Sequence, residues 1–292
     1  MITVESPTRV TLALDIIRRI EEGPLAGYHE LGIVKHMVAL GDTLHIESIG
    51  CEGGHGGRDI VQCDDVRVPI DDENICLKAC RLVRERFGVG EPLRIVIEKR
   101  IPVMGGLAGG SSNAAATLRA LNEMWGLGLT LSQFRDLGRT LGMDVPFFFS
   151  GGSAFDSEAT KVISTIETAV TFHFVLALPN FGISTKEAYA SIDYKRIGQD
   201  TVLTERLMTA LRNNDYAAAV ICLHNDFETS LFERYPRLKE IRDKLLKSGC
   251  VAACMSGSGS TIVGIATDRQ QAQKIAGEID CKTIVTETYQ PR

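Results

Sequence analysis

Apolar and polar positions alternate in several short segments of the 292-residue chain. Within residues 9–17, apolar side chains occur at every second position, at Val10, Leu12, Leu14 and Ile16. Similar alternation occurs over residues 42–49 and 93–101. A period of two places one set of side chains on one face, so these segments are predicted to form β-strands. The third segment ends directly before a glycine-rich loop.

Other segments repeat their apolar residues at the three-to-four spacing of an amphipathic helix. Asp71, Asp72 and Glu73 suit the N-terminus of the first of these helices, where the helix dipole favours negative charge. The predicted helices cover residues 74–87, the segment after Ser111, and residues 131–142, around 202–212, 235–248 and 268–279, with a further strand at 171–179.

These strands and helices are mixed without strict β–α alternation. The pattern therefore favours an α+β fold over a doubly wound parallel sheet. Composition shifts near residues 150–172, which is where the boundary between two domains is expected.

Composition excludes several classes of protein. The net charge of -5 comes without a basic stripe, which argues against a nucleic-acid partner. No apolar run is long enough to span a membrane, and the start of the sequence lacks the features of a signal peptide, so we expect a cytoplasmic protein with no membrane partner. The scattered cysteines are expected to be reduced core residues and not metal ligands, including the i,i+4 pairs Cys76/Cys80 and Cys250/Cys254. The eight cysteines are at positions 51, 63, 76, 80, 222, 250, 254 and 281.

Residues 102–125, PVMGGLAGGSSNAAATLRALNEMW, place a glycine-rich loop before a predicted helix. A helix N-terminus has unpaired N–H groups and partial positive charge, so such a loop can cradle a phosphate group. Glycines at 105, 106, 109 and 110 allow close approach of the backbone, while Ser111 and Ser112 add hydroxyl groups, with Ser112 a possible ligand for Mg²⁺.

The loop matches neither the Walker pattern nor a dinucleotide-binding glycine motif, and the H-R-D motif of protein kinases is absent. The pattern P-x-x-G-G-L-x-G-G-S-S-N-A-A instead resembles the ATP loop of the galactokinase, homoserine kinase, mevalonate kinase and phosphomevalonate kinase superfamily (GHMP kinases). Residues 6–14, SPTRVTLAL, and 255–265, MSGSGSTIVGI, resemble the first and third motifs of that family.

This resemblance implies two α+β lobes with the active site in the cleft between them. An N-terminal ATP-binding domain is expected at residues 1–155 and a C-terminal domain at 156–292, with ATP and Mg²⁺ required for activity. The segments at 26–31, 141–148 and 182–189 are similar to the branch of the family that acts in non-mevalonate isoprenoid biosynthesis, whose alcohol substrate carries a cytidine diphosphate group.

The resemblance also implies roles for individual residues. Asp144 matches the catalytic aspartate, and Arg9 is expected to be its electrostatic partner. The residues expected to bind ATP are Pro102, Gly105, Gly106, Leu107, Ala108, Gly109, Gly110, Ser111, Ser112, Asn113 and Asn74, although helix capping alone would explain Asn74. The residues expected to bind the alcohol substrate are Thr11, Tyr28, His29, Thr185, Tyr189, Gly257, Ser258 and Gly259.

Three departures from the family pattern concern the substrate side. The family motif S-P-A-K-I-N has lysine and asparagine where this chain has Arg9 and Thr11, and the link at residues 15–27 is longer than usual. Arginine keeps the positive charge but not the geometry of an ammonium group. The departures leave two alternatives open: a divergent kinase for another small alcohol, or a catalytically impaired nucleotide-binding protein.

Overall fold

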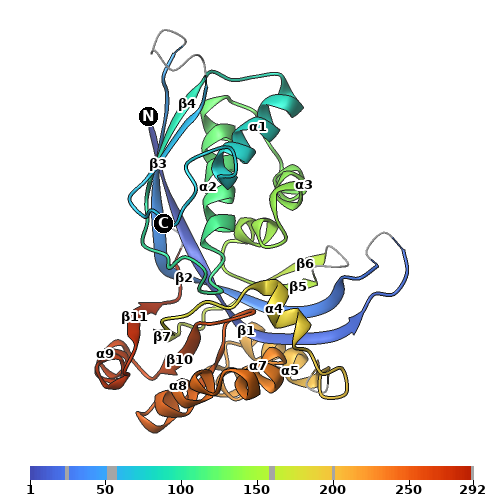
Figure 1. The fold of residues 1–292 in the computed structure, drawn as a ribbon, viewed down its shortest axis with the longest axis vertical. Helices are drawn as coiled ribbons and strands as arrows, with labels where there is room; N and C mark the ends of the chain where they lie inside the picture. Colours follow the sequence, from blue (N-terminus) through green and yellow to red (C-terminus); the bar gives the residue numbers. More distant parts are fainter. Residues whose placement is uncertain (24–25, 51–57, 158–161, 199–200, 291–292) are drawn as a thin grey trace. The chain divides into compact units, whose positions relative to one another are not determined.

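The computed structural model describes residues 1–23, 26–50, 58–157, 162–198 and 201–290 (Figure 1). Cys51 and His55 lie outside the described residues, as does part of the long link at 15–27. The structure is a mixture of helices and sheets, which confirms the predicted α+β class.

The chain divides into two compact units that are interleaved along the sequence. Unit 1 contains residues 1–8, 40–103 and 108–149, and unit 2 contains residues 9–39, 104–107 and 150–292. The glycine-rich loop therefore contributes residues to both units. The predicted boundary between family domains at residue 155 stays a prediction, as does the active-site cleft.

Among the described residues, unit 1 combines a sheet with three α-helices and one short 3₁₀ helix. The second half of β2 (His29–Ser48) pairs antiparallel with β4 (Leu93–Glu98), and β4 pairs parallel with β3 (Ile60–Cys63). Helices α1 and α2 pack together, and α3 contacts both of them. The helical elements of this unit are α1 (Ile75–Phe87), α2 (Gly109–Met124), α3 (Leu131–Leu141) and the short 3₁₀ helix η1 (Val145–Phe149).

Helix α1 shows how the local sequence sets the bounds of an element. The Asn74 side chain accepts a hydrogen bond from the N–H of Cys76, which caps the helix. Gly88 adopts a left-handed conformation that ends it. Cys76 and Cys80 face the core, and burial raises the pKa of the Cys76 thiol to about 12, so this thiol stays protonated. All seven described cysteines have free thiols.

Unit 2 contains an antiparallel sheet in the order β11-β7-β10-β9. Helix α8 covers β9 and β10, while α9 covers β7 and β11 (Figure 1). These strands are β7 (His173–Leu178), β9 (Ala252–Met255), β10 (Ile262–Ala266) and β11 (Lys282–Glu287), and the two helices are α8 (Pro236–Lys247) and α9 (Arg269–Glu278).

The first half of β2 also belongs to unit 2, where it pairs with β5, and β5 pairs with β6. Strand β1 pairs parallel with β8. These strands are β1 (Ile2–Arg19), β5 (Ser153–Ser157), β6 (Val162–Ile166) and β8 (His224–Asn225), and the remaining helices are α4 (Thr185–Ala190), α5 (Thr201–Arg212), α6 (Tyr216–Val220) and α7 (Phe227–Arg234).

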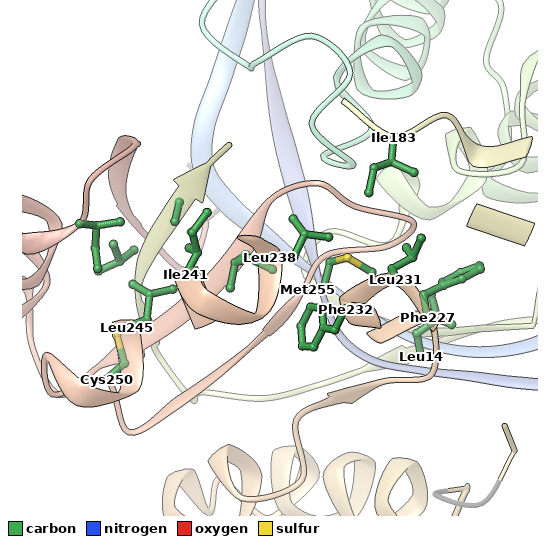
Figure 2. Close-up of a cluster of buried hydrophobic side chains, with 14 of the residues drawn as sticks. Leu14, Ile183, Phe227, Leu231, Phe232, Leu238, Ile241, Leu245, Cys250 and Met255 are labelled. Atoms are coloured by element: carbon green, nitrogen blue, oxygen red, sulfur yellow. The ribbon is translucent and has the colours of Figure 1, made fainter. Parts of the chain in front are cut away.

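The core of unit 2 joins residues that are far apart in the sequence (Figure 2). Leu14 from β1 and Met255 from β9 lie in one cluster with Leu238, Ile241 and Leu245, which form the inner face of α8. All are at most 2% exposed. Truncating a fully buried leucine to alanine typically costs about 2–5 kcal/mol, so this cluster contributes strongly to the stability of the unit.

The predicted helices and strands are all present, with shifted ends. The helix predicted after Ser111 begins at Gly109, two residues before that serine, and the first strand extends over Ile2–Arg19. Sequence patterns did not reveal the short elements β3, β5, β6, β8, β9, β10, α4, α6, α7 and η1, nor β11. Short elements contain too few residues to establish a period.

Candidate active site

The N-terminus of α2 is open to a ligand. Ala108 precedes the helix in a left-handed conformation with φ of 53° and makes no side-chain cap hydrogen bond. The first N–H groups of this 16-residue helix therefore carry the partial positive charge that binds anions. Gly110 is exposed, and a Cβ atom there would find only Ile75 Cγ2, at 4.0 Å.

Gly109 has a different reason to be glycine. A Cβ atom at this position would lie 2.9 Å from Cγ2 of Ile101 and 3.2 Å from Nζ of Lys99. Lys99 is itself fixed by Asp42, whose carboxylate accepts from Nζ at 2.7 Å. Packing against Lys99 and Ile101, which follow β4, thus requires glycine at 109, whereas a side chain at 110 would have space.

Gly106 lies against the C-terminal glycine loop within unit 2. Its φ is +70°, and a Cβ atom would be 2.6 Å from the carbonyl oxygens of both Ser256 and Gly259. Only glycine satisfies both conditions. The second and third sequence motifs therefore meet, backbone against backbone, at Gly106.

Arg9 joins the first motif to the same place. Its Nη1 donates to the carbonyl oxygen of Gly106 at 2.7 Å and to Oγ1 of Thr11 at 3.4 Å. A Cβ atom on Gly257 would lie 3.4 Å from this nitrogen. Arg9 is only 6% exposed, so its guanidinium is part of the wall of the glycine loops.

Three side chains that sequence reasoning missed hold these loops together. Ser256 accepts from the N–H of Thr11 at 3.2 Å and donates to the Gly106 carbonyl oxygen at 3.3 Å. The Thr261 hydroxyl donates to the carbonyl oxygen of Gly105. The Asn225 amide donates to the carbonyl oxygens of Met255 and Gly257 at 2.7 and 2.8 Å. Ser256 and Thr261 lie within the motif at residues 255–265 that the sequence did mark, whereas Asn225 has no local signal.

Ser112 is deeply engaged within unit 1. Its hydroxyl accepts from Ser6 at 2.7 Å and donates to the carbonyl oxygen of Pro7 at 2.7 Å. Ser6 also contacts the Asn113 amide oxygen at 2.7 Å. Ser112 and Asn113 are 2% and 3% exposed, so both side chains anchor the helix to the first motif. Ser111 is half-buried and more accessible.

Asp144 stands at the turn between α3 and η1. The backbone N–H of Gly142 ends α3 by donating to Gly138, and the Asp144 carbonyl oxygen accepts from the N–H of Phe147. Asp144 is half-buried, and the apolar residues 145–149 that directly follow it are buried. Asp144 belongs to unit 1 and Arg9 to unit 2, and their partnership stays a prediction.

Four aromatic side chains gather in unit 2. The His29 ring stacks on Tyr189 with centroids 4.5 Å apart, and Tyr189 in turn meets Phe227 edge-on. Tyr194, which sequence reasoning did not select, lies 2.7 Å from His29 Nε2 through its hydroxyl. Tyr28 is 60% exposed. Burial, and then the charge of Arg19, lower the pKa of His29, so the ring is neutral near pH 7.

The remaining predicted residues are placed as follows. Thr185 Oγ1 and Ser258 Oγ are 3.4 Å apart, which joins the start of α4 to the third motif. Pro102 is half-buried and Leu107 is 1% exposed. Gly259, like Gly257, has a positive φ. Within the described ranges, no three His, Cys, Asp or Glu side chains are grouped so as to hold a metal ion, and no helix is long and apolar enough to cross a membrane.

Comparison with known proteins gives a consistent result. The N-terminal domain of GHMP kinases matches residues 74–152, and the C-terminal domain matches residues 206–285. The 4-diphosphocytidyl-2-C-methyl-D-erythritol kinase of Shouchella clausii is 34% identical over 273 residues, which cover 94% of this chain and 88% of that protein. The kinase of the same name from Geobacillus kaustophilus is 33% identical over 94% of this chain and 91% of its own length.

Solved structures agree with these relatives. A crystal structure of 4-(cytidine 5'-diphospho)-2C-methyl-D-erythritol kinase is similar with a TM-score of 0.81 and 28% identity, covering 99% of this chain and all of the other. A mevalonate kinase structure has a TM-score of 0.70 at 14% identity, with 99% of both chains covered, and shows the shared fold alone.

Proposed function

Because this chain belongs to the GHMP kinase family, we propose that it transfers the γ-phosphoryl group of ATP to the 2-hydroxyl of 4-diphosphocytidyl-2-C-methyl-D-erythritol. The observation that carries this proposal is the identity of about one third, along 94% of the chain, with kinases that bear this name. The contacts around the glycine loops and within the aromatic cluster support a proposed role for residues in each part of the reaction.

The N-terminus of α2 is the proposed phosphate site. Gly110 leaves the helix end open, and the half-buried Ser111 hydroxyl lies next to it. N–H groups at a helix start bind phosphate oxygens through hydrogen bonds and the helix dipole. Earlier in the loop, within unit 2, the Arg9 guanidinium holds the Gly106 carbonyl oxygen.

Mg²⁺ fits this site mainly through the phosphates of ATP. A hydroxyl group has one donor and two acceptor positions, so Ser112 keeps one lone pair beyond its bonds to Ser6 and Pro7. At 2% exposure this oxygen is a weak candidate ligand, and the more accessible Ser111 is the better placed hydroxyl. When bound, Mg²⁺ neutralises charge on the transferring phosphoryl group.

Asp144 is the proposed base. Its carboxylate accepts the proton of the substrate hydroxyl as that oxygen forms its bond to the γ-phosphorus and the bond to the β-phosphate oxygen of ADP breaks. The buried run after Asp144 reduces its contact with water, which strengthens its interaction with the hydroxyl. The positive charge of Arg9 offsets the negative charge of the phosphates.

The cytosine end is assigned to the aromatic cluster of unit 2. The exposed Tyr28 ring offers a face for stacking, and the neutral His29 ring offers hydrogen bonds to the edge of the base. The Tyr189 ring stacks on the His29 ring and so supports it. Thr185 and Ser258 present adjacent hydroxyl groups for the remainder of the substrate.

The test is ATP- and Mg²⁺-dependent ADP release with the cytidine compound, beside homoserine, mevalonate and galactose. We expect turnover on the cytidine compound alone. Asp144→Asn should lower kcat by about 10²–10⁴-fold, the range of a general base, with ATP affinity retained. Asp136→Asn, which removes an exposed carboxylate on α3 that pairs with Arg139, is the matched control. Full activity of Asp144→Asn would contradict the assignment of the base.

A second candidate function follows from Arg9 and Thr11. Both replace residues of the family motif, and both contact the glycine loops. If the chain is instead a kinase for another small alcohol, the cytidine compound will be inactive while another alcohol is turned over. Binding of ATP with no turnover on any compound would indicate a nucleotide-binding protein without kinase activity.

A further inference from the structure

Tyr194 is placed to control the chemistry of His29. Its hydroxyl oxygen lies 2.7 Å from Nε2 of His29, and the two ring planes are only 12° apart. We propose that Tyr194 is a positioning residue that holds His29 in the tautomer with its proton on Nδ1, and thereby makes the site select cytosine over uracil. This inference rests on the proposed function.

The backbone around Tyr194 is fixed by its neighbour. The N–H of Asp193 donates to the Ser230 hydroxyl of α7 at 3.3 Å. The Asp193 carboxylate accepts from the N–H of Lys195 at 3.0 Å, and its carbonyl oxygen accepts from the N–H of Arg196. These hydrogen bonds make a turn at Tyr194 and hold its backbone in position, although the residue is 49% exposed.

The direction of the hydrogen bond follows from the acidity of the two groups. A phenol loses its proton with a pKa of about 10, whereas a neutral imidazole N–H is a far weaker acid and its bare nitrogen is a good acceptor. The tyrosine O–H therefore donates to Nε2. His29 is neutral, because burial and Arg19 lower its pKa, so the single ring proton is on Nδ1.

A proton on Nδ1 distinguishes the two pyrimidines. Cytosine has an acceptor at N3, which can receive this N–H, whereas uracil carries a proton on N3 and would oppose it. Within the part of the chain that the structure describes, the only hydrogen bond of the His29 ring is the one to Tyr194. Nδ1 is thus available to a base. One neutral hydrogen bond corresponds to about a 3- to 10-fold difference in affinity.

The kinetic test compares Tyr194→Phe with the wild type on the cytidine substrate and on its uridine counterpart. The variant keeps the ring and removes only the hydroxyl. We expect the cytidine-to-uridine ratio of kcat/KM to fall about 3- to 10-fold, through a higher KM for the cytidine compound. The KM for ATP and kcat should change little. Tyr216→Phe is the matched control, because it removes a hydroxyl that donates to the Ala266 carbonyl oxygen and not to His29.

A second measurement needs no substrate. The ¹⁵N chemical shifts of the His29 ring report which nitrogen carries the proton. We expect Nδ1–H in the wild type and in Tyr216→Phe, and a shift toward Nε2–H in Tyr194→Phe. An unchanged tautomer in Tyr194→Phe, or an unchanged cytidine-to-uridine ratio, would overturn the proposal for Tyr194. Absence of turnover on the cytidine compound in the wild type would instead reject the proposed function, while the ¹⁵N result would still decide the role of Tyr194 toward His29.

Discussion

Gly106→Ala tests whether the glycine loops are built by backbone packing. The added Cβ atom would lie 2.6 Å from the carbonyl oxygens of Ser256 and Gly259, whereas ordinary contact begins near 3.4 Å. Both oxygens would have to retreat by the difference, 0.8 Å. Asn225 resists this movement, because its amide holds the carbonyl oxygens of Met255 and Gly257 on either side of Ser256.

The cost of this substitution has two parts. A left-handed conformation with φ of +70° costs alanine roughly 1–2 kcal/mol. Forcing an extra carbon into a packed site costs about 1–3 kcal/mol more. The sum of about 2–5 kcal/mol is a large share of the roughly 5–15 kcal/mol that keeps a protein folded. For a unit of this size Tm should fall by at least about 4 °C, at about 2–4 °C per kcal/mol.

Gly110→Ala is the control in the same loop. Its Cβ atom would find space, and alanine is up to about 1 kcal/mol more favourable than glycine inside a helix. We expect an unchanged or slightly higher Tm. If phosphate approaches here, as proposed, the Kd for ATP should rise by about tenfold or more, the value of one hydrogen bond to a charged group.

Thermal unfolding and calorimetric titration with ATP measure both effects. Gly106→Ala should lower Tm, and Gly110→Ala should weaken ATP binding at full stability. A Tm for Gly106→Ala within about 1 °C of the wild type would refute the packing argument. Unchanged ATP affinity in Gly110→Ala would refute the placement of phosphate at this helix end.

Three further predictions concern Arg9 and two buried titratable groups, Glu228 and His36. Arg9→Lys should lower kcat/KM by about tenfold, because the charged hydrogen bond to the Gly106 carbonyl oxygen is lost. A rise in turnover would show instead that the arginine is a poor substitute for the family lysine. Burial raises the pKa of Glu228 to about 7. Between pH 4.5 and 7 the folded protein therefore holds a proton that the unfolded chain releases, so the free energy of unfolding falls as pH rises. Glu228→Gln should remove this fall, measured by urea unfolding at several pH values. Burial lowers the pKa of His36 to about 4. Between pH 4 and 6.5 the unfolded chain therefore binds a proton that the folded protein does not, so the free energy of unfolding rises with pH. His36→Asn should remove that rise in the same measurement.

The sequence alone determined most of the long elements and the family, and it predicted phosphate binding at the glycine loop. Periodicity is a local property, so helices such as α1, with its Asn74 cap, are readable from a few adjacent residues. The density of glycine and serine at residues 105–112 likewise predicted an anion site, and the order of three motifs indicated the family.

Only the tertiary structure decided which glycine serves which purpose. Gly106 packs on the third motif, Gly109 packs on Ile101, and Gly110 faces open space, although the three look alike in the sequence. It also placed Tyr194 on His29, 165 residues away. Contacts across such distances depend on strand register and helix packing, which many residues set jointly. No local pattern encodes them, because the energy that selects them comes from burial in the folded chain.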